Sequence, residues 1–276
     1  DIDRAELNPM LYDFQKDIVR WALKKGKACI FADCGLGKTP MQLSWAYQVH
    51  KHTKGKILIL APLAVAEQTR REAEKFGYDA KVAEEQSDCI EGINITNYEK
   101  LDRFTASEFT GVVLDESSIL KSYSGKVRTS IIQNFHDVPY KLACTATPAP
   151  NDYMELGNHS EFCGVMTRAE MLSMFFVHDG GQTSKWRLKG HAEDVFWKWL
   201  ATFSVFIDNP ANIGYSVSGY HLPPLKIYEI IVDGDEPEKG TLTLTERRKA
   251  RKDSLVLRCD KAAELTNNSN EQWLVW

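Results

Sequence analysis

The chain of 276 residues has a net charge of −4, with 43% hydrophobic and 26% charged residues. This mix is typical of a globular protein and excludes a surface that is basic throughout, so any nucleic-acid contact has to be a local patch. The sequence contains no secretory signal and no apolar run of the roughly 18 to 20 residues that a membrane span needs, so we expect a cytoplasmic protein with no membrane partner.

The six cysteines are scattered along the chain without a CxxC pair, and several lie in apolar runs such as "KACIFA" and "KLACTA". This distribution predicts buried free thiols in a reducing compartment rather than a disulfide framework or a zinc site.

Strand-like and helix-like segments alternate over the first part of the chain. Residues 8–25 show helical spacing of apolar positions, namely Leu11, Phe14, Ile18, Val19 and Ala22. The strands that follow are continuous apolar runs, which fit a parallel sheet buried on both faces. The predicted strands are residues 28–33, 56–62, 93–97, 111–116 and 140–147, with helices at 39–50 and 64–76. This order predicts a doubly wound α/β sheet with ligands at the carboxyl ends of its strands.

The pattern changes after about residue 165. Residues 168–176 and 191–203 are predicted helices, and the turn-rich, basic segment 178–190 between them is a candidate β-hairpin. In the second helix, Val195, Trp199 and Phe203 recur at helical spacing and predict a buried stripe. We then expect one apolar strand within residues 220–240 and a charged amphipathic helix or helix pair over residues 243–265.

The segment "ADCGLGKT", residues 32–39, is a candidate phosphate-binding loop because it follows a strand and precedes a helix. Gly35 and Gly37 allow backbone N–H groups to approach phosphate oxygens, and the helix N-terminus favours negative charge. Lys38 can reach the β- and γ-phosphates, and the Thr39 hydroxyl can coordinate Mg²⁺. These residues predict a site for ATP and Mg²⁺.

Hydrolysis requires carboxylates at a second strand end, and "GVVLDESS" supplies Asp115 and Glu116. We expect Asp115 to hold Mg²⁺ and Glu116 to polarise the attacking water. Thr145 and Thr147 follow the next strand in "CTATPAPND" and can bond to the Asp-Glu loop, although the two prolines there also fit an ordinary strand-end turn.

Taken in order, these motifs resemble superfamily-two helicases and translocases, within them the Swi/Snf-like branch with its phage and prophage members. "LYDFQKDIV" resembles the glutamine motif, "ADCGLGKT" motif I, "LILAPLAVAEQ" motif Ia, "ITNYEKL" motif Ib, "LDESSILKS" motif II and "CTATPAPNDYMEL" motif III. The resemblance is strong over residues 8–160 and weak over 205–276. It implies a RecA-like parallel sheet flanked by helices, the first motor lobe of an ATP-driven motor that acts on double-stranded DNA in a bacterial or phage-infected cell.

The resemblance also implies roles for individual residues. It predicts ATP binding by Gln15, Cys34, Gly35, Leu36, Gly37, Lys38 and Thr39, with Lys38 and Glu116 catalytic and with Thr39 and Asp115 as Mg²⁺ ligands. It predicts coupling by Ser118, Thr145 and Thr147, and nucleic-acid contacts by Pro62, Leu63, Thr96, Asn97, Tyr98 and Lys121. The implied domains are an ATP-binding lobe at 1–165, a helical and hairpin insertion at 166–222, and a return strand, helical linker and start of a second lobe at 223–276.

Two departures from the family pattern affect these expectations. The fourth position of motif II is usually histidine and here is Ser118, whose shorter reach puts the strength of coupling in question. No arginine-finger motif follows residue 160, and "EQWLVW" at the chain end looks like the first strand of a second lobe, so we expect a fragment of a longer protein. An arginine finger contributes about 10³–10⁵ in rate in related enzymes, so the isolated chain is expected to bind ATP but hydrolyse it poorly.

Alternatives exist for each predicted nucleic-acid segment. Residues 96–98 also fit a strand-end turn with a packed tyrosine, and "TSKWRLKG" at 183–190 also fits a solvated hairpin. The basic run at 246–252 fits a solvated helix face. For the whole chain, the alternatives are a helicase on RNA or single-stranded DNA, a phosphate-loop NTPase acting on a small molecule, and a non-catalytic scaffold.

Overall fold

The structure is a computed structural model that describes residues 2–121, 125–178, 186–216, 219–220, 224–232 and 243–275. The chain divides into two compact units, residues 1–221 and residues 222–276, which are described separately below.

A seven-stranded sheet forms the centre of the first unit, and every neighbouring pair of its strands is parallel. The strand order is β3-β4-β2-β5-β6-β1-β9. The strands are β1 (Lys27–Ala32), β2 (Lys56–Ala61), β3 (Ala80–Val82), β4 (Ile93–Asn97), β5 (Phe109–Asp115), β6 (Tyr140–Thr145) and β9 (Ser204–Ile207). The predicted parallel α/β sheet is confirmed, and the two edge strands β3 and β9 are additions that the sequence pattern did not predict.

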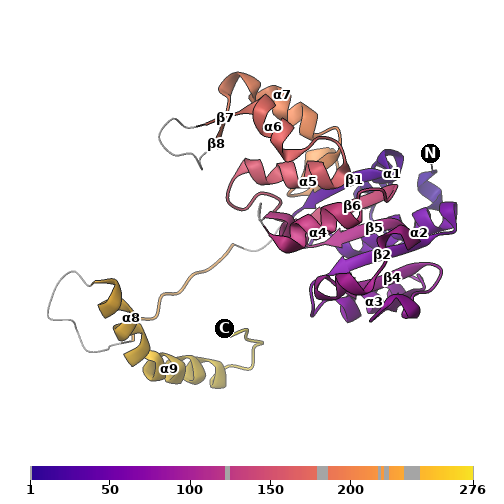
Figure 1. Ribbon diagram of the computed structural model, residues 1–276. Helices are drawn as coiled ribbons and strands as arrows, with labels where there is room; N and C mark the ends of the chain where they lie inside the picture. Colours follow the sequence, from indigo (N-terminus) through magenta and orange to yellow (C-terminus); the bar gives the residue numbers. More distant parts are fainter. Residues whose placement is uncertain are drawn as a thin grey trace. The chain divides into compact units, whose positions relative to one another are not determined.

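Helices cover both faces of this sheet (Figure 1). One face packs on α1 (Asp13–Lys25), α2 (Lys38–Thr53) and α3 (Ala66–Lys75). The other packs on α4 (Lys126–Asn134), α5 (Leu156–Cys163), α6 (Arg168–Phe175) and α7 (Glu193–Leu200). Short 3-10 turns lie at Arg4–Glu6, Gln86–Asp88, Tyr98–Arg103, Ala106–Glu108, Ser117–Lys121, Tyr153–Glu155, Gly190–Ala192 and Pro210–Ile213.

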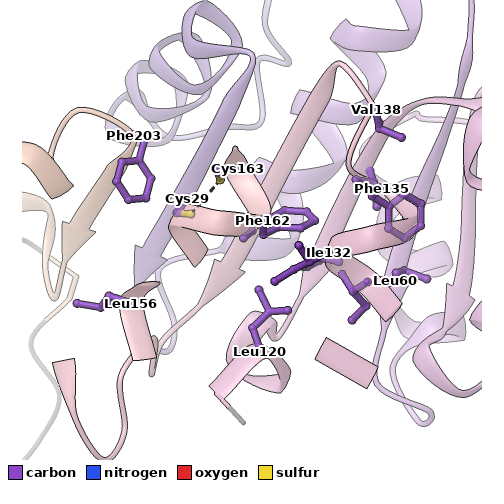
Figure 2. Packing of buried hydrophobic residues seen from close by; sticks show 14 of the residues in the cluster. Cys29, Leu60, Leu120, Ile132, Phe135, Val138, Leu156, Phe162, Cys163 and Phe203 are labelled. Atoms are coloured by element: carbon purple, nitrogen blue, oxygen red, sulfur yellow. Dashed lines mark hydrogen bonds between the residues drawn. The ribbon is translucent and has the colours of Figure 1, made fainter. Parts of the chain in front are cut away.

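The continuous apolar runs of the sequence arise because each central strand is buried on both faces. In β1, Cys29 and Phe31 belong to the core beneath α5, whereas Ala28 and Ile30 belong to the core beneath α2. Figure 2 shows the first of these cores, where Cys29 meets Cys163 of α5 with 3.5 Å between their sulfur atoms. Burial raises the pKa of the Cys29 thiol, which keeps it protonated.

The cysteine prediction is confirmed in part. All six thiols are free, and Cys29, Cys144 and Cys163 are buried. Cys34 and Cys259 are exposed, however, because one lies in the phosphate loop and the other on a helix without buried positions.

The segment after α6 contains the predicted hairpin arms. Strand β7 (Phe176–His178) pairs antiparallel with β8 (Trp186–Leu188), and residues 179–185 between them lie outside the described residues. The predicted stripe is confirmed in part: Phe203 is buried and Trp199 is half-buried against the core, but Val195 is 57% exposed, and the buried positions of α7 are Phe196 and Leu200. Phe196 takes the buried position in place of Val195 because it packs against the rings of Phe175 and Phe176.

The second unit contains the predicted helix pair, α8 (Leu244–Asp253) and α9 (Leu255–Asn267), and neither helix has a buried residue. The strands expected in this part are not observed: residues 224–232 and 271–275 have no strand partner and are exposed or half-exposed, and Trp276 lies outside the described residues. Among the described helices of the whole chain, none combines the length and the apolar character that crossing a bilayer requires.

Candidate functional site

Three adjacent strands of the sheet end together and bring the predicted site residues to one edge. Strand β6 lies between β5 and β1, and both pairs are parallel, so all three carboxyl ends share this edge. Asp115 is the last residue of β5, Thr145 is the last residue of β6, and the glycine-rich loop follows β1. The fold therefore assembles segments that are far apart in the sequence.

The loop between β1 and α2 has the backbone geometry of a phosphate cradle. Gly35 and Gly37 have φ values of 82° and 76°, which only glycine adopts without strain, and Gly37 is the N-cap of α2. Cys34 and Gly35 are exposed, whereas Leu36 is buried and anchors the loop to the core beneath α2. The N–H groups of the first turn of α2 have no acceptor within their own helix, so this end of α2 favours an anion.

The Lys38 side chain hydrogen-bonds back to the start of the loop. Its ammonium donates to the carbonyl oxygens of Ala32, at 2.8 Å, and of Asp33, at 3.2 Å. These bonds hold the cation beside the loop, where a phosphate would meet it.

Gln15 connects α1 to the same loop. The buried side chain donates through Nε2 to the Leu36 carbonyl at 3.0 Å and accepts at Oε1 from the Tyr12 amide at 2.9 Å. A Cβ placed on Gly37 would lie only 2.3 Å from Gln15 Nε2, so the two residues are in direct contact. The structure thus places Gln15 against the loop backbone, and its contact with an adenine stays a prediction.

Asp115 is a nearly buried carboxylate, with 9% of its surface exposed. Its Oδ1 accepts from Gln42 Nε2 at 2.8 Å and from the Glu116 amide at 3.1 Å. Burial raises the pKa of Asp115, and the Gln42 hydrogen bond opposes that shift. Gln42 was not predicted, although its place one helical turn after Lys38 is a signal that could have identified it.

Glu116 has a left-handed backbone with φ 53°, which is strained for a residue other than glycine. Its Oε1 accepts from Thr145 Oγ1 at 2.6 Å and from Ser118 Oγ at 2.7 Å. The reach of Ser118 is therefore sufficient to join Glu116 and Thr145 in one hydrogen-bonded group. Thr147 is different: its side chain is exposed, and only its amide takes part, donating to Thr145 Oγ1 at 3.0 Å.

The donor set at this edge fits a Mg²⁺ ion that is shared with phosphate. Oxygen atoms of Thr39 and Asp115 are hard ligands of the kind this ion selects. A cation beside Asp115 would offset the cost of burying its negative charge. Within the described residues no group of three His, Cys, Asp or Glu side chains could hold a metal alone, so the remaining ligands would come from phosphate and water.

The predicted nucleic-acid residues divide into two groups. The side chains of Thr96, Asn97 and Tyr98 are buried. Asn97 Nδ2 donates to the carbonyls of Pro62 and Leu63, at 3.4 and 3.2 Å, and Tyr98 Oη donates to the Asp115 carbonyl at 2.7 Å. The Asn97 and Tyr98 side chains hold neighbouring strand ends together and the Thr96 side chain is fully buried, so any phosphate contact from this turn would have to come from backbone groups.

The second group is accessible to a polymer. Leu63 is 66% exposed, Pro62 is half-buried, and Lys121 is exposed at the end of the 3-10 turn that follows Glu116. All three lie at the carboxyl edge of the sheet, since β2 neighbours β5.

Cavities lie at both ends of β6. One cavity of about 650 Å³ is lined by Leu23, Lys24, His52 and Tyr140 and lies at the amino end of β6. A smaller one of about 500 Å³ is adjacent to the loop through Asp33 and to the β6 end through Ala146 and Pro148. Cys34 and Gly35 of the phosphate loop are exposed, so its chemistry rather than its burial identifies it.

This parallel strand order, with a glycine-rich loop before α2, is that of a RecA-like core, the fold of the two solved structures reported below. The chain belongs to the family described as the res subunit of type III restriction enzymes, whose profile matches residues 8–150, more than half of its 276 residues.

Curated relatives include a chromodomain-helicase-DNA-binding protein 1-like of Danio rerio, 31% identical over 170 residues. A chromodomain-helicase-DNA-binding protein 3 homolog of Caenorhabditis elegans is 26% identical over 195 residues. These alignments cover 53% and 55% of this chain but only 16% and 11% of the relatives, so the chain spans a small part of their length.

Two solved structures share the fold. The Sulfolobus solfataricus SWI2/SNF2 ATPase core in complex with double-stranded DNA has a TM-score of 0.61 at 20% identity, covering 75% of this chain and 46% of that core. The same ATPase core domain described without DNA has a TM-score of 0.59 at 21% identity, covering 75% and 45%. At these identities the likeness establishes the Swi2/Snf2-like fold.

Proposed function

We propose that this chain is the ATP-binding lobe of a DNA-stimulated ATPase that translocates along double-stranded DNA. The observation that carries the proposal is the hydrogen-bonded group at the strand ends, where Thr145 and Ser118 both bond to Glu116 beside the Lys38 loop. Catalytic carboxylates in such enzymes have to be held near the phosphates, and this arrangement supplies that restraint.

In this proposal the loop amides and Lys38 bind the phosphates of ATP. Thr39 and Asp115 hold Mg²⁺, which neutralises phosphate charge when it is bound. Glu116 orients a water molecule and accepts its proton through Oε2, because Oε1 is already occupied by the two hydroxyl donors. Gln15 sets the position of the loop from α1.

The choice of duplex DNA is supported by the described Sulfolobus complex, whose fold this chain shares. Lys121 and the backbone around Pro62 and Leu63 are the proposed contacts with the DNA backbone. Phosphate contacts of this kind position a protein without reading sequence, as a translocating motor requires.

A second RecA-like lobe belongs to the same proposal. The chain aligns with fewer than half of the residues in the Sulfolobus core, so groups that complete the ATP site would come from residues outside these 276. Alone, the chain would bind Mg-ATP and hydrolyse it slowly.

Equilibrium binding of Mg-ATP to this chain and to its Lys38→Ala variant tests the proposal. We expect micromolar to millimolar affinity for the native chain and at least a tenfold loss for the variant, about 1.4 kcal/mol, because Lys38 is the cation beside the loop. Lys24→Ala, an exposed lysine on α1, is the matched control and should bind as the native chain does. Equal binding by native chain and Lys38→Ala would contradict an ATP site at this loop.

A further inference from the structure

Helix α5 has eight residues and buries three adjacent polar side chains. Its central side chains Asn158, His159 and Ser160 are polar, yet each has 0% of its surface exposed. Burying a polar side chain destabilises a fold unless a hydrogen bond compensates, so the partners of these three groups indicate what the helix does.

Two of the three partners lie in the segment that directly follows Glu116. Asn158 Nδ2 donates to the Leu120 carbonyl at 2.6 Å, and His159 Nε2 lies 3.1 Å from Ser117 Oγ. Ser160 Oγ instead donates to the Met166 carbonyl at 2.8 Å, beyond the end of the helix. The polar interior of α5 is therefore directed mainly at the 3-10 turn Ser117–Lys121.

Apolar contacts and an ion pair reinforce the same junction. Leu156 and Phe162 of α5 belong to one core with Leu120 (Figure 2). Arg128 of α4 pairs with Glu161 of α5, so the chain on the far side of the turn is also fixed to this helix. The ring of Phe31 in β1 meets His159 edge to face, with 5.1 Å between centroids, which fixes the imidazole from the other side.

The imidazole acts as a neutral group here. Burial lowers the pKa of His159 to about 4, so the ring is uncharged near neutral pH and forms a hydrogen bond with the Ser117 hydroxyl rather than an ion pair. A neutral, fully enclosed ring provides a fixed hydrogen-bonding position.

These contacts act next to a strained residue. The left-handed backbone of Glu116 is strained and persists only where neighbouring groups determine it. Thr145 and Ser118 restrain its side chain, and the α5 contacts restrain the backbone that follows it.

We propose that Asn158 and His159 are positioning residues that hold the Ser117–Lys121 turn and thereby set the carboxylate of Glu116 for hydrolysis. This inference rests on the proposed ATPase function. Neither residue touches the phosphate loop in the contacts described, so their loss should impair the chemical step and leave ATP binding unchanged.

The test compares His159→Phe, Ser117→Ala and their double variant in the full-length protein. The phenyl ring keeps the shape and the Phe31 contact but loses the hydrogen bond, and His159→Gln restores a hydrogen-bonding side chain. We expect each single variant to lower kcat about tenfold while KM for ATP changes less than about twofold. The double variant should be no slower than either single variant, because His159→Phe and Ser117→Ala remove the same hydrogen bond. His159→Gln should recover most of the rate.

Hydrogen exchange of the amides at residues 116–121 provides a readout independent of hydrolysis. In His159→Phe these amides should exchange about tenfold faster, while amides in α2 and the melting temperature stay close to native. Unchanged exchange at 116–121 would overturn the inference, as would additive losses in the double variant or a kcat loss that only follows the folded fraction. Absence of ATP hydrolysis by the native protein would contradict the proposed function instead, and the exchange result would still decide whether α5 holds the turn.

Discussion

At the scale of single residues, the hydrogen bonds around Glu116 distinguish two threonines that the sequence treats alike. Thr145 is fully buried and donates to Glu116 Oε1, whereas Thr147 is exposed and offers only its amide to Thr145. The two residues are therefore expected to contribute unequally to hydrolysis.

We predict that Thr145→Val lowers kcat about tenfold, since the isosteric side chain cannot donate to Glu116. Thr147→Val should change kcat by less than about twofold. Steady-state kinetics of the full-length protein with DNA would measure both, with thermal unfolding as the check on folding. Equal rates for the two variants would show that the hydroxyl of Thr145 has no special role.

The buried imidazole of His159 makes stability depend on pH. Its folded pKa of about 4 lies below the ordinary value of 6.5, so the unfolded chain binds more protons between these two values. The stability that depends on a neutral His159 is fully present above pH 6.5, and it is lost as the pH falls from 6.5 towards 4.

We predict that the free energy of unfolding of the native chain, relative to His159→Gln, falls by about 2 kcal/mol between pH 7 and pH 5. Denaturant unfolding at several pH values measures this difference. His52→Gln, the same substitution at an exposed histidine, is the matched control variant. A constant difference between native chain and His159→Gln would mean that His159 is not held neutral.

Much of the site could be predicted from residue types and spacing. The phosphate loop, the Asp115–Glu116 pair and Thr145 follow from a local pattern of strand, turn and helix, which short-range sterics determine. The spacing of Gln42 from Lys38 indicates its helix face, but its contact with Asp115 and that of His159 with Ser117 join residues 73 and 42 positions apart, which no local pattern reveals. The burial of Thr96, Asn97 and Tyr98 also depends on neighbouring strands, so a pattern of polar side chains after a strand did not reveal it.

At the scale of elements, α1 is joined to the phosphate loop through Gln15, which contacts both Leu36 and Gly37. Gly37 adopts a left-handed backbone directly against Gln15, whereas nothing lies within 4 Å of a Cβ placed on Gly35. Both glycines have positive φ, so any side chain strains either position.

We predict that Gly35→Ala destabilises the fold by about 1–2 kcal/mol through backbone strain alone. Gly37→Ala should destabilise it further, because the new Cβ displaces Gln15 from its hydrogen bond with Leu36. Denaturant unfolding of the two variants measures the difference. Equal destabilisation would indicate that Gln15 moves aside without cost.

The strands that the sequence analysis did not predict, β3 and β9, are short and have weak local sequence patterns. Strand β3 has three residues with no buried position, and β9 has four residues that follow a helix almost immediately. The opposite error occurred at residues 224–232, where an apolar run predicted a strand. A strand needs a partner for its backbone groups, and none pairs with this run in the described part of the chain.

At the scale of the whole molecule, the first unit contains every residue of the proposed ATP site. The sequence predicted a parallel sheet but not its strand order, because order depends on which strands pair across distant parts of the chain. The second unit, residues 222–276, has no buried residue in either of its helices.

We predict that a chain ending at residue 221 unfolds with a free energy within about 1 kcal/mol of the full chain, since residues 224–232 and 243–275 include no buried position. It should also keep the affinity for Mg-ATP. Denaturant unfolding and binding titrations of both chains measure this. Loss of cooperative unfolding in the shorter chain would mean that the second unit is needed for the fold.

The most direct test of the proposed function is steady-state ATP hydrolysis by the full-length protein, measured alone and with duplex DNA, single-stranded DNA or RNA. The account predicts that duplex DNA raises turnover most strongly, that Lys38→Ala and Glu116→Gln abolish it, and that this 276-residue chain alone turns over slowly. Turnover that no nucleic acid changes would contradict a DNA-stimulated motor, and stronger stimulation by RNA or single-stranded DNA would contradict the choice of duplex DNA.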